Sequence, residues 1–161
     1  MPLYHATTAT LSVGDEIEAT RDVEFYPAVV ALLERSRPGG SPSRARCLFA
    51  ADSAVKAAAF MTSQLRTTGR GSEPFNVYEV EMPVIHCGAF ALIDEIDARL
   101  SRADQTDRCL EEYWHPSLEW KFLEAFGPAL IVRGLAPVNE ILVEHFMVNI
   151  YSADRRQAKT L

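Results

Sequence analysis

The sequence lacks several features that would assign a protein to a class at once. Its apolar runs stay well short of the ~18 residues that a membrane-spanning helix requires. The N-terminus has no basic region followed by an apolar stretch, so a secretory signal is not predicted. Its three cysteines, Cys47, Cys87 and Cys109, are spaced too irregularly for a zinc site or a disulfide framework. We therefore expect reduced thiols and a cytoplasmic location.

The sequence also lacks an excess of positive charge and histidines spaced as metal ligands. The net charge is −6, which argues against a broad basic surface that grips nucleic acid. His86, His115 and His145 show no ligand spacing, so no metal is expected. Four arginines, Arg35, Arg37, Arg44 and Arg46, cluster in the predicted loop RSRPGGSPSRAR (35–46), so a local basic groove is not excluded.

The residues that are present suit one α+β domain. A chain of 161 residues can bury a single core, and we find neither an internal repeat nor a second domain. Apolar runs and alternation predict strands at 3–5, 46–50, 75–82, 129–133 and 140–143. Helices are predicted at 53–65, 90–100 and 110–126, the last with a break near Pro116. These elements alternate without a regular βαβ order, which favours α+β over a doubly wound sheet.

Two aromatic residues lie close to each other in sequence, Phe49 in the strand predicted at 46–50 and Phe60 in the helix predicted at 53–65. The segment CLFAADSAVKAAAF (47–60) is typical of a strand, an Asp-Ser turn and an alanine-rich helix, with Phe49 and Phe60 eleven positions apart. Their rings could flank a cleft and stack on a planar cation, at ~0.5–2 kcal/mol. On these residues alone, two ordinary core positions are the stronger interpretation.

A carboxylate interrupts the strand predicted at 140–143. In VNEILVEHFMVNIY (138–151), Glu140 stands among apolar residues. Because burial of an unpaired charge is costly, Glu140 faces solvent, finds a partner or lines a site. Glu144 is the nearby competitor for any such role.

Three segments, in this order, resemble the ADP-ribosyltransferase-like superfamily, with its rifampin-modifying and DNA-modifying members as the nearest likeness. The opening YHATTATLSVGDEI is similar to its Tyr-His-Gly-Thr start, which a Leu-x-x-Gly-Asp-x-Ile segment follows. The segment 47–60 resembles its aromatic-bearing strand and helix, and NEILV resembles its Glu-x-Leu-Val strand. The resemblance implies a single domain, 1–161, with a split mixed or antiparallel sheet and flanking helices.

The resemblance implies a site for NAD as substrate. His5 would hydrogen-bond the ribose hydroxyls, and Glu140 would be the catalytic carboxylate that stabilises positive charge as nicotinamide leaves. Ala6 stands where the family usually has glycine, and it suits the site if its backbone torsion is ordinary. The residues that would contact NAD are Tyr4, His5, Ala6, Thr7, Phe49 and Phe60.

The function implied by the resemblance is mono-ADP-ribosyl transfer from NAD to an acceptor, which could be a protein, a nucleic acid or a small molecule. Trp114 and Glu112 are candidates for acceptor binding, although packing of a helix on the sheet explains the tryptophan better. Two alternatives remain open. A non-catalytic NAD- or nucleic-acid-binding module is favoured by phenylalanine at position 49, where the family often has tyrosine. An NAD-dependent RNA 2′-phosphotransferase would need clustered arginines around a phosphate.

Overall fold

Two antiparallel sheets organise the computed structural model, which describes residues 2–20, 22–23, 25–41 and 43–161. The first sheet has the order β1-β4-β7-β2, with β1 Leu3–Thr7, β4 Asn76–Glu81, β7 Ala129–Ala136 and β2 Glu16–Glu18. The second has the order β3-β6-β5, with β3 Leu48–Ala50, β6 Leu123–Gly127 and β5 His86–Ala89. The predicted α+β class is confirmed.

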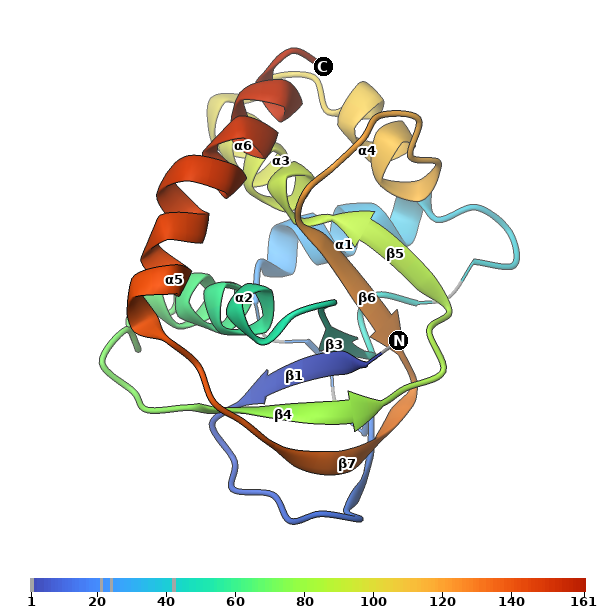
Figure 1. The fold of residues 1–161 in the computed structure, drawn as a ribbon. Coiled ribbons are helices and arrows are strands. Elements are labelled where there is room, and N and C mark those ends of the chain that lie inside the picture. Colours follow the sequence, from blue (N-terminus) through green and yellow to red (C-terminus); the bar gives the residue numbers. More distant parts are fainter. Residues whose placement is uncertain (1, 21, 24, 42) are drawn as a thin grey trace.

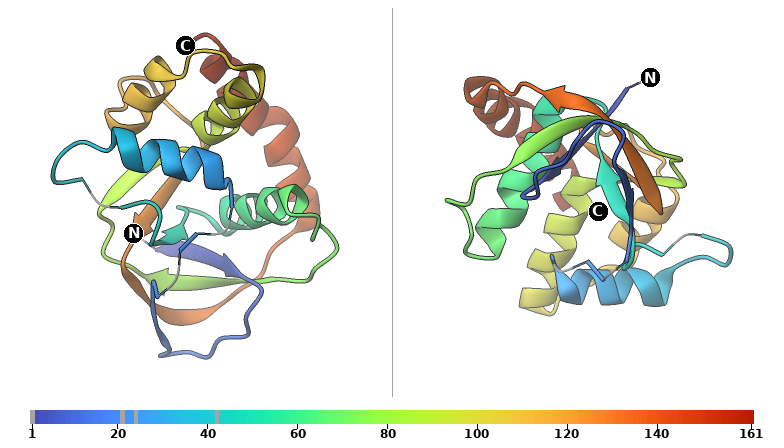
Figure 2. Two further views of the ribbon diagram at one scale, coloured as in Figure 1. Left: turned by 180° about the vertical axis from the view of Figure 1, so that it is seen from behind. Right: turned by 90° about the horizontal axis from the view of Figure 1, so that it is seen from below.

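The helices pack around these sheets, and α1, α2 and α3 lie on the same side of β1 and β4 (Figure 2). Their bounds are α1 Pro27–Ser36, α2 Ala54–Thr67, α3 Phe90–Arg102 and α4 Asp107–Trp114. The chain ends in one continuous helical rod of α5 Glu140–His145, the π-helical η1 Phe146–Tyr151 and α6 Ser152–Lys159 (Figure 1). Within the described ranges, none of these helices combines the length and the apolar character needed to cross a membrane.

A pair of reciprocal backbone hydrogen bonds joins the two sheets. The Tyr4 amide donates to the Ala51 carbonyl and the Ala51 amide donates to the Tyr4 carbonyl, each at 2.9 Å. Strand β1 is an edge of the first sheet and β3 is an edge of the second, so the bridge pairs two edges that would otherwise stay open.

An aromatic core lies behind this junction. The fully buried Phe90 ring lies 5.1 Å from Phe60, 5.1 Å from Phe122 and 5.8 Å from Tyr151, measured between ring centroids. These contacts connect α2, α3, the segment before β6 and η1. Offset and tilted ring pairs of this kind add to the free energy gained from burial of apolar area.

Most predicted elements are confirmed, with small shifts at their ends. The helix predicted at 53–65 is α2, and Ser53 caps it by accepting a hydrogen bond from the Lys56 amide at 3.2 Å. The helix predicted at 90–100 is α3. The strands predicted at 3–5, 46–50, 75–82 and 129–133 correspond to β1, β3, β4 and β7.

Two predictions near the C-terminus are wrong. The strand predicted at 140–143 is helix α5, because the Asn139 side chain accepts hydrogen bonds from the amides of Ile141 and Leu142 and so starts a helix. The helix predicted at 110–126 ends at Trp114, and its second half contains β6. There the Glu112 carboxylate accepts hydrogen bonds from the Ser117 amide and the Trp120 indole, which fixes a loop.

Gly88 offers a test of this packing, because a Cβ there would lie 2.4 Å from Cε2 and 2.5 Å from Cζ of the Tyr113 ring. We expect Gly88→Ala to lower the free energy of unfolding by roughly 1–3 kcal/mol through overpacking. Gly134→Ala on β7 is the matched control, since a Cβ there would have no atom of the described residues within 4 Å. Urea unfolding measures both variants, and equal effects would contradict the described contact between Gly88 and Tyr113.

Candidate functional site

A cavity of about 470 Å³ opens beside β1. Its walls come from the β1–β2 connection, the segment after β2, β3 and the C-terminal half of α2. A volume in this range is typical of sites for small molecules and cofactors. Five residues implied by the resemblance line it: His5, Ala6, Thr7, Phe49 and Phe60.

His5 is held by the backbone of the neighbouring sheet. Its Nδ1 lies 2.6 Å from the Phe49 carbonyl oxygen, and a carbonyl only accepts, so Nδ1 carries the proton. Burial lowers the pKa of His5, and the hydrogen bond to Phe49 offsets part of that effect. The imidazole is therefore neutral at neutral pH. Its Nε2, for which the described residues provide no partner, can accept a hydrogen bond from a hydroxyl.

The two phenylalanines belong both to the core and to the cavity wall. Their ring centroids are 5.5 Å apart, with 34° between the ring planes. Each ring also contacts the core, Phe49 at 6.0 Å from Phe126 and Phe60 at 5.1 Å from Phe90. Both side chains are half-buried. The core interpretation and the cleft interpretation of this pair are thus compatible.

The backbone around the opening motif is ordinary strand. Ala6 pairs with Val77 within β1 and β4, and its φ is not positive, so alanine takes the place of glycine without strain. The Thr7 hydroxyl accepts a hydrogen bond from the Ala9 amide at 3.1 Å, which turns the chain away from β1. Tyr4 does not line the His5 cavity; it lines a small void between the sheets.

Sequence reasoning missed a buried charged cluster beneath Phe49. Arg44 and Glu124 are each 1% exposed and form two hydrogen bonds, at 2.8 and 3.0 Å. The Tyr113 hydroxyl donates to Glu124 at 2.6 Å and accepts from Arg44 at 3.0 Å. The Arg44 guanidinium carbon lies 4.7 Å from the Phe49 ring centroid, a cation–π distance. The Nη1 atom of Arg44 has no hydrogen-bond acceptor among the described residues, so the Phe49 ring provides the attraction that offsets its burial.

The Glu124 carboxylate raises the pKa values of its two buried neighbours, Arg44 and Tyr113. Burial alone would lower the pKa of Arg44, but the adjacent Glu124 carboxylate raises it overall. Burial, followed by the charge of Glu124, raises the pKa of Tyr113 well above its usual value, so the hydroxyl remains a donor. The open question of a basic groove at 35–46 is answered in part, because Arg44 points inward and Arg46 pairs with Asp22 at 3.1 Å.

The predicted catalytic carboxylate lies elsewhere. Glu140 is the exposed first residue of α5, and the described residues that line the cavity do not include it. The carboxylates that do line the cavity are Glu18, on β2, and Asp22. The catalytic role of Glu140 therefore stays a prediction. Its position on a helix, instead of the expected strand, does not support that role.

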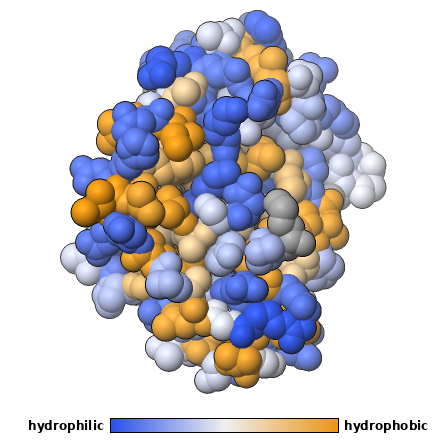
Figure 3. Space-filling model, viewed as in Figure 1, coloured by the Kyte–Doolittle hydropathy of each residue, from blue (hydrophilic) through white to orange (hydrophobic). Residues whose placement is uncertain are grey.

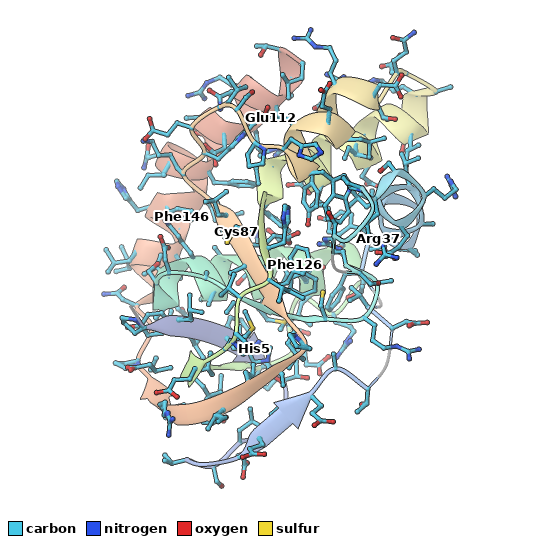
Figure 4. All side chains as sticks on the ribbon, turned by 90° about the vertical axis from the view of Figure 1, so that its right-hand side faces the viewer. His5, Arg37, Cys87, Glu112, Phe126 and Phe146 are labelled. Carbon is cyan, nitrogen blue, oxygen red and sulfur yellow. The ribbon has the colours of Figure 1, made fainter. Side chains whose placement is uncertain are left out.

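The predicted acceptor-binding residues are also outside the cavity. Figure 4 shows Glu112 near the top of the molecule and His5 well below it, and neither Glu112 nor Trp114 lines the cavity. Glu112 is buried, and hydrogen bonds from Ser117 and Trp120 outweigh the effect of burial and lower its pKa. Trp114 is buried in α4 and packs 5.2 Å from His86, between ring centroids. Both side chains thus stabilise the region around α4.

Comparison with known proteins adds no further assignment. No protein-family model matches the chain, and a search of curated proteins gives no significant match. Across the described part of the chain, no group of three or more His, Cys, Asp or Glu side chains is arranged to hold a metal ion. The likeness to ADP-ribosyltransferases thus depends on the sequence motifs alone.

The lowered pKa of His5 predicts a pH dependence of stability. Below the ordinary histidine pKa of about 6.5, the unfolded chain binds a proton that the folded protein does not, so the free energy of unfolding falls as pH falls toward the lowered pKa. Between pH ~7.5 and ~5.5 we expect the free energy of unfolding to fall less in His5→Gln than in the wild type. Urea unfolding at both values measures it, with His86→Gln as the control for loss of an imidazole. An identical pH dependence in wild type and His5→Gln would refute the inference.

The buried cluster predicts strong coupling between Arg44 and Glu124. Arg44→Met leaves the Glu124 carboxylate buried without its partner, and we expect a loss of roughly 3–5 kcal/mol. The double variant Arg44→Met/Glu124→Gln removes both charges and is expected to recover part of that loss. A double-mutant cycle by urea unfolding gives the coupling energy. Additive losses would mean that the two side chains do not interact.

Proposed function

We propose that the chain is a mono-ADP-ribosyltransferase that binds NAD in the His5 cavity. One observation carries the proposal: two motif segments 44 positions apart meet at one cavity, where His5 is fixed by the carbonyl of Phe49. The neutral imidazole, the pair of phenylalanine rings and the volume of the cavity all suit a ligand with hydroxyls and a planar cationic ring.

Within this proposal each wall of the cavity has a distinct task. The Nε2 atom of His5 accepts a hydrogen bond from a ribose hydroxyl and fixes the sugar. Phe49 and Phe60 offer ring faces for the nicotinamide, and the guanidinium behind Phe49 holds that ring in place. Orientation of this kind lowers the entropic part of the barrier to bond cleavage.

The transfer itself needs a carboxylate. As the bond between nicotinamide and ribose breaks, positive charge develops at the anomeric carbon, and a carboxylate nearby stabilises it. Nicotinamide leaves with the bonding electrons, and a nucleophile of the acceptor forms the new bond. The resemblance assigns this role to Glu140, whereas the cavity wall offers Glu18 and Asp22.

A non-catalytic NAD-binding module is the second candidate function. The observation that favours it is the place of Glu140, which is exposed at the start of α5 while His5 lines the cavity. An RNA 2′-phosphotransferase is less well supported, because Arg44, one of the four arginines of the basic loop, is buried against Glu124.

We expect His5→Gln to weaken NAD binding at least ~10-fold, equivalent to ~1.4 kcal/mol, because a glutamine cannot reproduce the fixed Nε2 acceptor. Calorimetric titration with NAD measures the affinity. His86→Gln is the matched control, since His86 is also half-buried and lies 3.2 Å from a backbone carbonyl, that of Tyr113, but does not line the cavity. Absence of NAD binding by the wild type would overturn the proposal.

A panel of amide variants separates transfer from binding. Release of nicotinamide is measured in wild type, Glu140→Gln, Glu18→Gln and Asp22→Asn, with labelled NAD offered to protein, DNA and RNA. Loss of release with retained NAD affinity identifies the catalytic carboxylate. Binding of NAD by the wild type without any release would instead support the module.

A further inference from the structure

One phenylalanine of the chain lies against the His5 cavity and not against the core. The sequence has eight phenylalanines, and seven of them belong to the main cluster of buried apolar residues or pack on it. Phe25 is the exception, because neither described cluster of buried apolar residues includes it or has it as a neighbour. It is nevertheless half-buried, and it lines the cavity. The burial of the Phe25 ring is therefore explained by the cavity wall.

Phe25 also differs from the apolar residues of the outer surface. Figure 3 shows apolar and polar residues intermixed over α5 and η1, where Ile141 and Val148 are largely exposed. Apolar side chains scattered in this way are normal on a protein surface and indicate no site. A half-buried aromatic ring in a cavity wall is what sites for small molecules and cofactors use, since aromatic and apolar groups line most of them.

The residue after Phe25 has an unusual backbone conformation. Tyr26 has φ 53° and ψ 55°, in the left-handed region that bulky L residues rarely adopt. Helix α1 begins directly after it at Pro27, and the Val30 amide donates a hydrogen bond to the Tyr26 carbonyl at 2.9 Å. Such a conformation persists only where the surroundings hold it, and it occurs most often at binding and catalytic sites. The turn at Tyr26 thus separates the helix from the cavity wall.

The Tyr26 side chain holds this turn in place. Its hydroxyl donates to a carboxylate oxygen of Asp94 at 2.8 Å, and its ring meets the Phe90 ring edge-on, with 6.4 Å between centroids. Burial, followed by the charge of Asp94, raises the pKa of Tyr26, so the hydroxyl remains a donor. Tyr151 donates to the other oxygen of Asp94, which fixes that carboxylate. Neighbouring side chains therefore have different surroundings, with Tyr26 at the core and Phe25 at the cavity.

We propose that Phe25 is a specificity residue that stacks on a second planar ring of the ligand, and that Tyr26 is the residue that positions it. Within the described ranges no ring contact joins Phe25 to the pair of Phe49 and Phe60, so the cavity offers two separate aromatic sites. The inference rests on the proposed function. A dinucleotide carries two planar rings, and with nicotinamide at the phenylalanine pair, the purine is left for Phe25. Stacking on an aromatic side chain needs only the face of the base.

Calorimetric titration with three probes tests the role of Phe25. NAD and ADP-ribose both carry the purine, whereas nicotinamide mononucleotide carries only the other ring. We expect Phe25→Ala to weaken binding of NAD and ADP-ribose at least ~10-fold and to change that of nicotinamide mononucleotide less than ~2-fold, because only the purine loses its stacking partner. Phe25→Tyr keeps the ring face and should bind all three probes as the wild type does.

Tyr26→Phe and Tyr151→Phe are a matched pair that tests the positioning role. Each variant keeps its ring and removes one hydrogen bond to the same Asp94 carboxylate, but only Tyr26 adjoins Phe25. We therefore expect similar losses of stability in urea unfolding. Only Tyr26→Phe should weaken NAD binding, by at least ~3-fold, since the lost hydrogen bond is the one that holds the turn.

A measurement without ligand follows the position of the side chain at residue 25. In Phe25→Trp, acrylamide quenches mainly the introduced indole, because the native Trp114 and Trp120 are only 5% and 6% exposed. Added to Phe25→Trp, the substitution Tyr26→Phe should increase quenching, and Tyr151→Phe should leave it unchanged.

Each part of the inference has an outcome that would overturn it. Quenching that both tyrosine variants leave unchanged, or increase equally, overturns the positioning role of Tyr26. Equal weakening of all three probes by Phe25→Ala overturns the stacking role, while the proposed function stands. A wild type that binds none of the probes overturns the proposed function and the stacking role together, and the quenching result still decides the positioning role.

Discussion

The structure depends on the bridge between Tyr4 and Ala51. It is a single antiparallel pair of residues, yet it ties the edge of one sheet to the edge of the other. His5 follows Tyr4 directly and Phe49 lies two positions before Ala51, so the bridge sets the register in which Nδ1 reaches the Phe49 carbonyl. A shift of one residue would turn the His5 side chain to the other face of β1. The position of the imidazole is therefore a property of how the sheets are joined.

The second constraint is the ion pair beneath Phe49. Burial of two charges costs more than the interior usually returns, so the pair of Arg44 and Glu124 adds little to stability compared with well-packed apolar residues. The pair instead fixes a position. Hydrogen bonds to Glu124 and Tyr113 hold the Arg44 guanidinium against the Phe49 ring. That position is possible only because Gly88 leaves room for the Tyr113 ring. Rigidity at the cavity wall thus comes from polar groups in the core.

The parts of the fold that were predictable are those with local causes. Ser53 indicates the start of α2 because its cap bond is made three residues away, and alternation marks β4 within its own length. The segment 140–143 fits a buried strand and a helix equally well by composition, and only the Asn139 cap decides. For the site, His5 and Phe49 followed from motifs. Arg44 could not be placed, because its partner Glu124 lies 80 positions away and a basic loop is normally solvated.

The C-terminal rod of α5, η1 and α6 is connected to the wall of the His5 cavity by a chain of aromatic rings. The rod packs inward through Tyr151, whose ring meets Phe90 at 5.8 Å, and Phe90 meets Phe60 of the cavity wall at 5.1 Å. Three rings therefore connect the inner side of the rod to the cavity. Energetic coupling through such a chain requires an element with two discrete arrangements. Here Asp94 accepts hydrogen bonds from both Tyr26 and Tyr151, which gives the inner face of the rod one arrangement. The rod is therefore expected to act as a fixed support for Phe60, without passing a conformational change to the cavity.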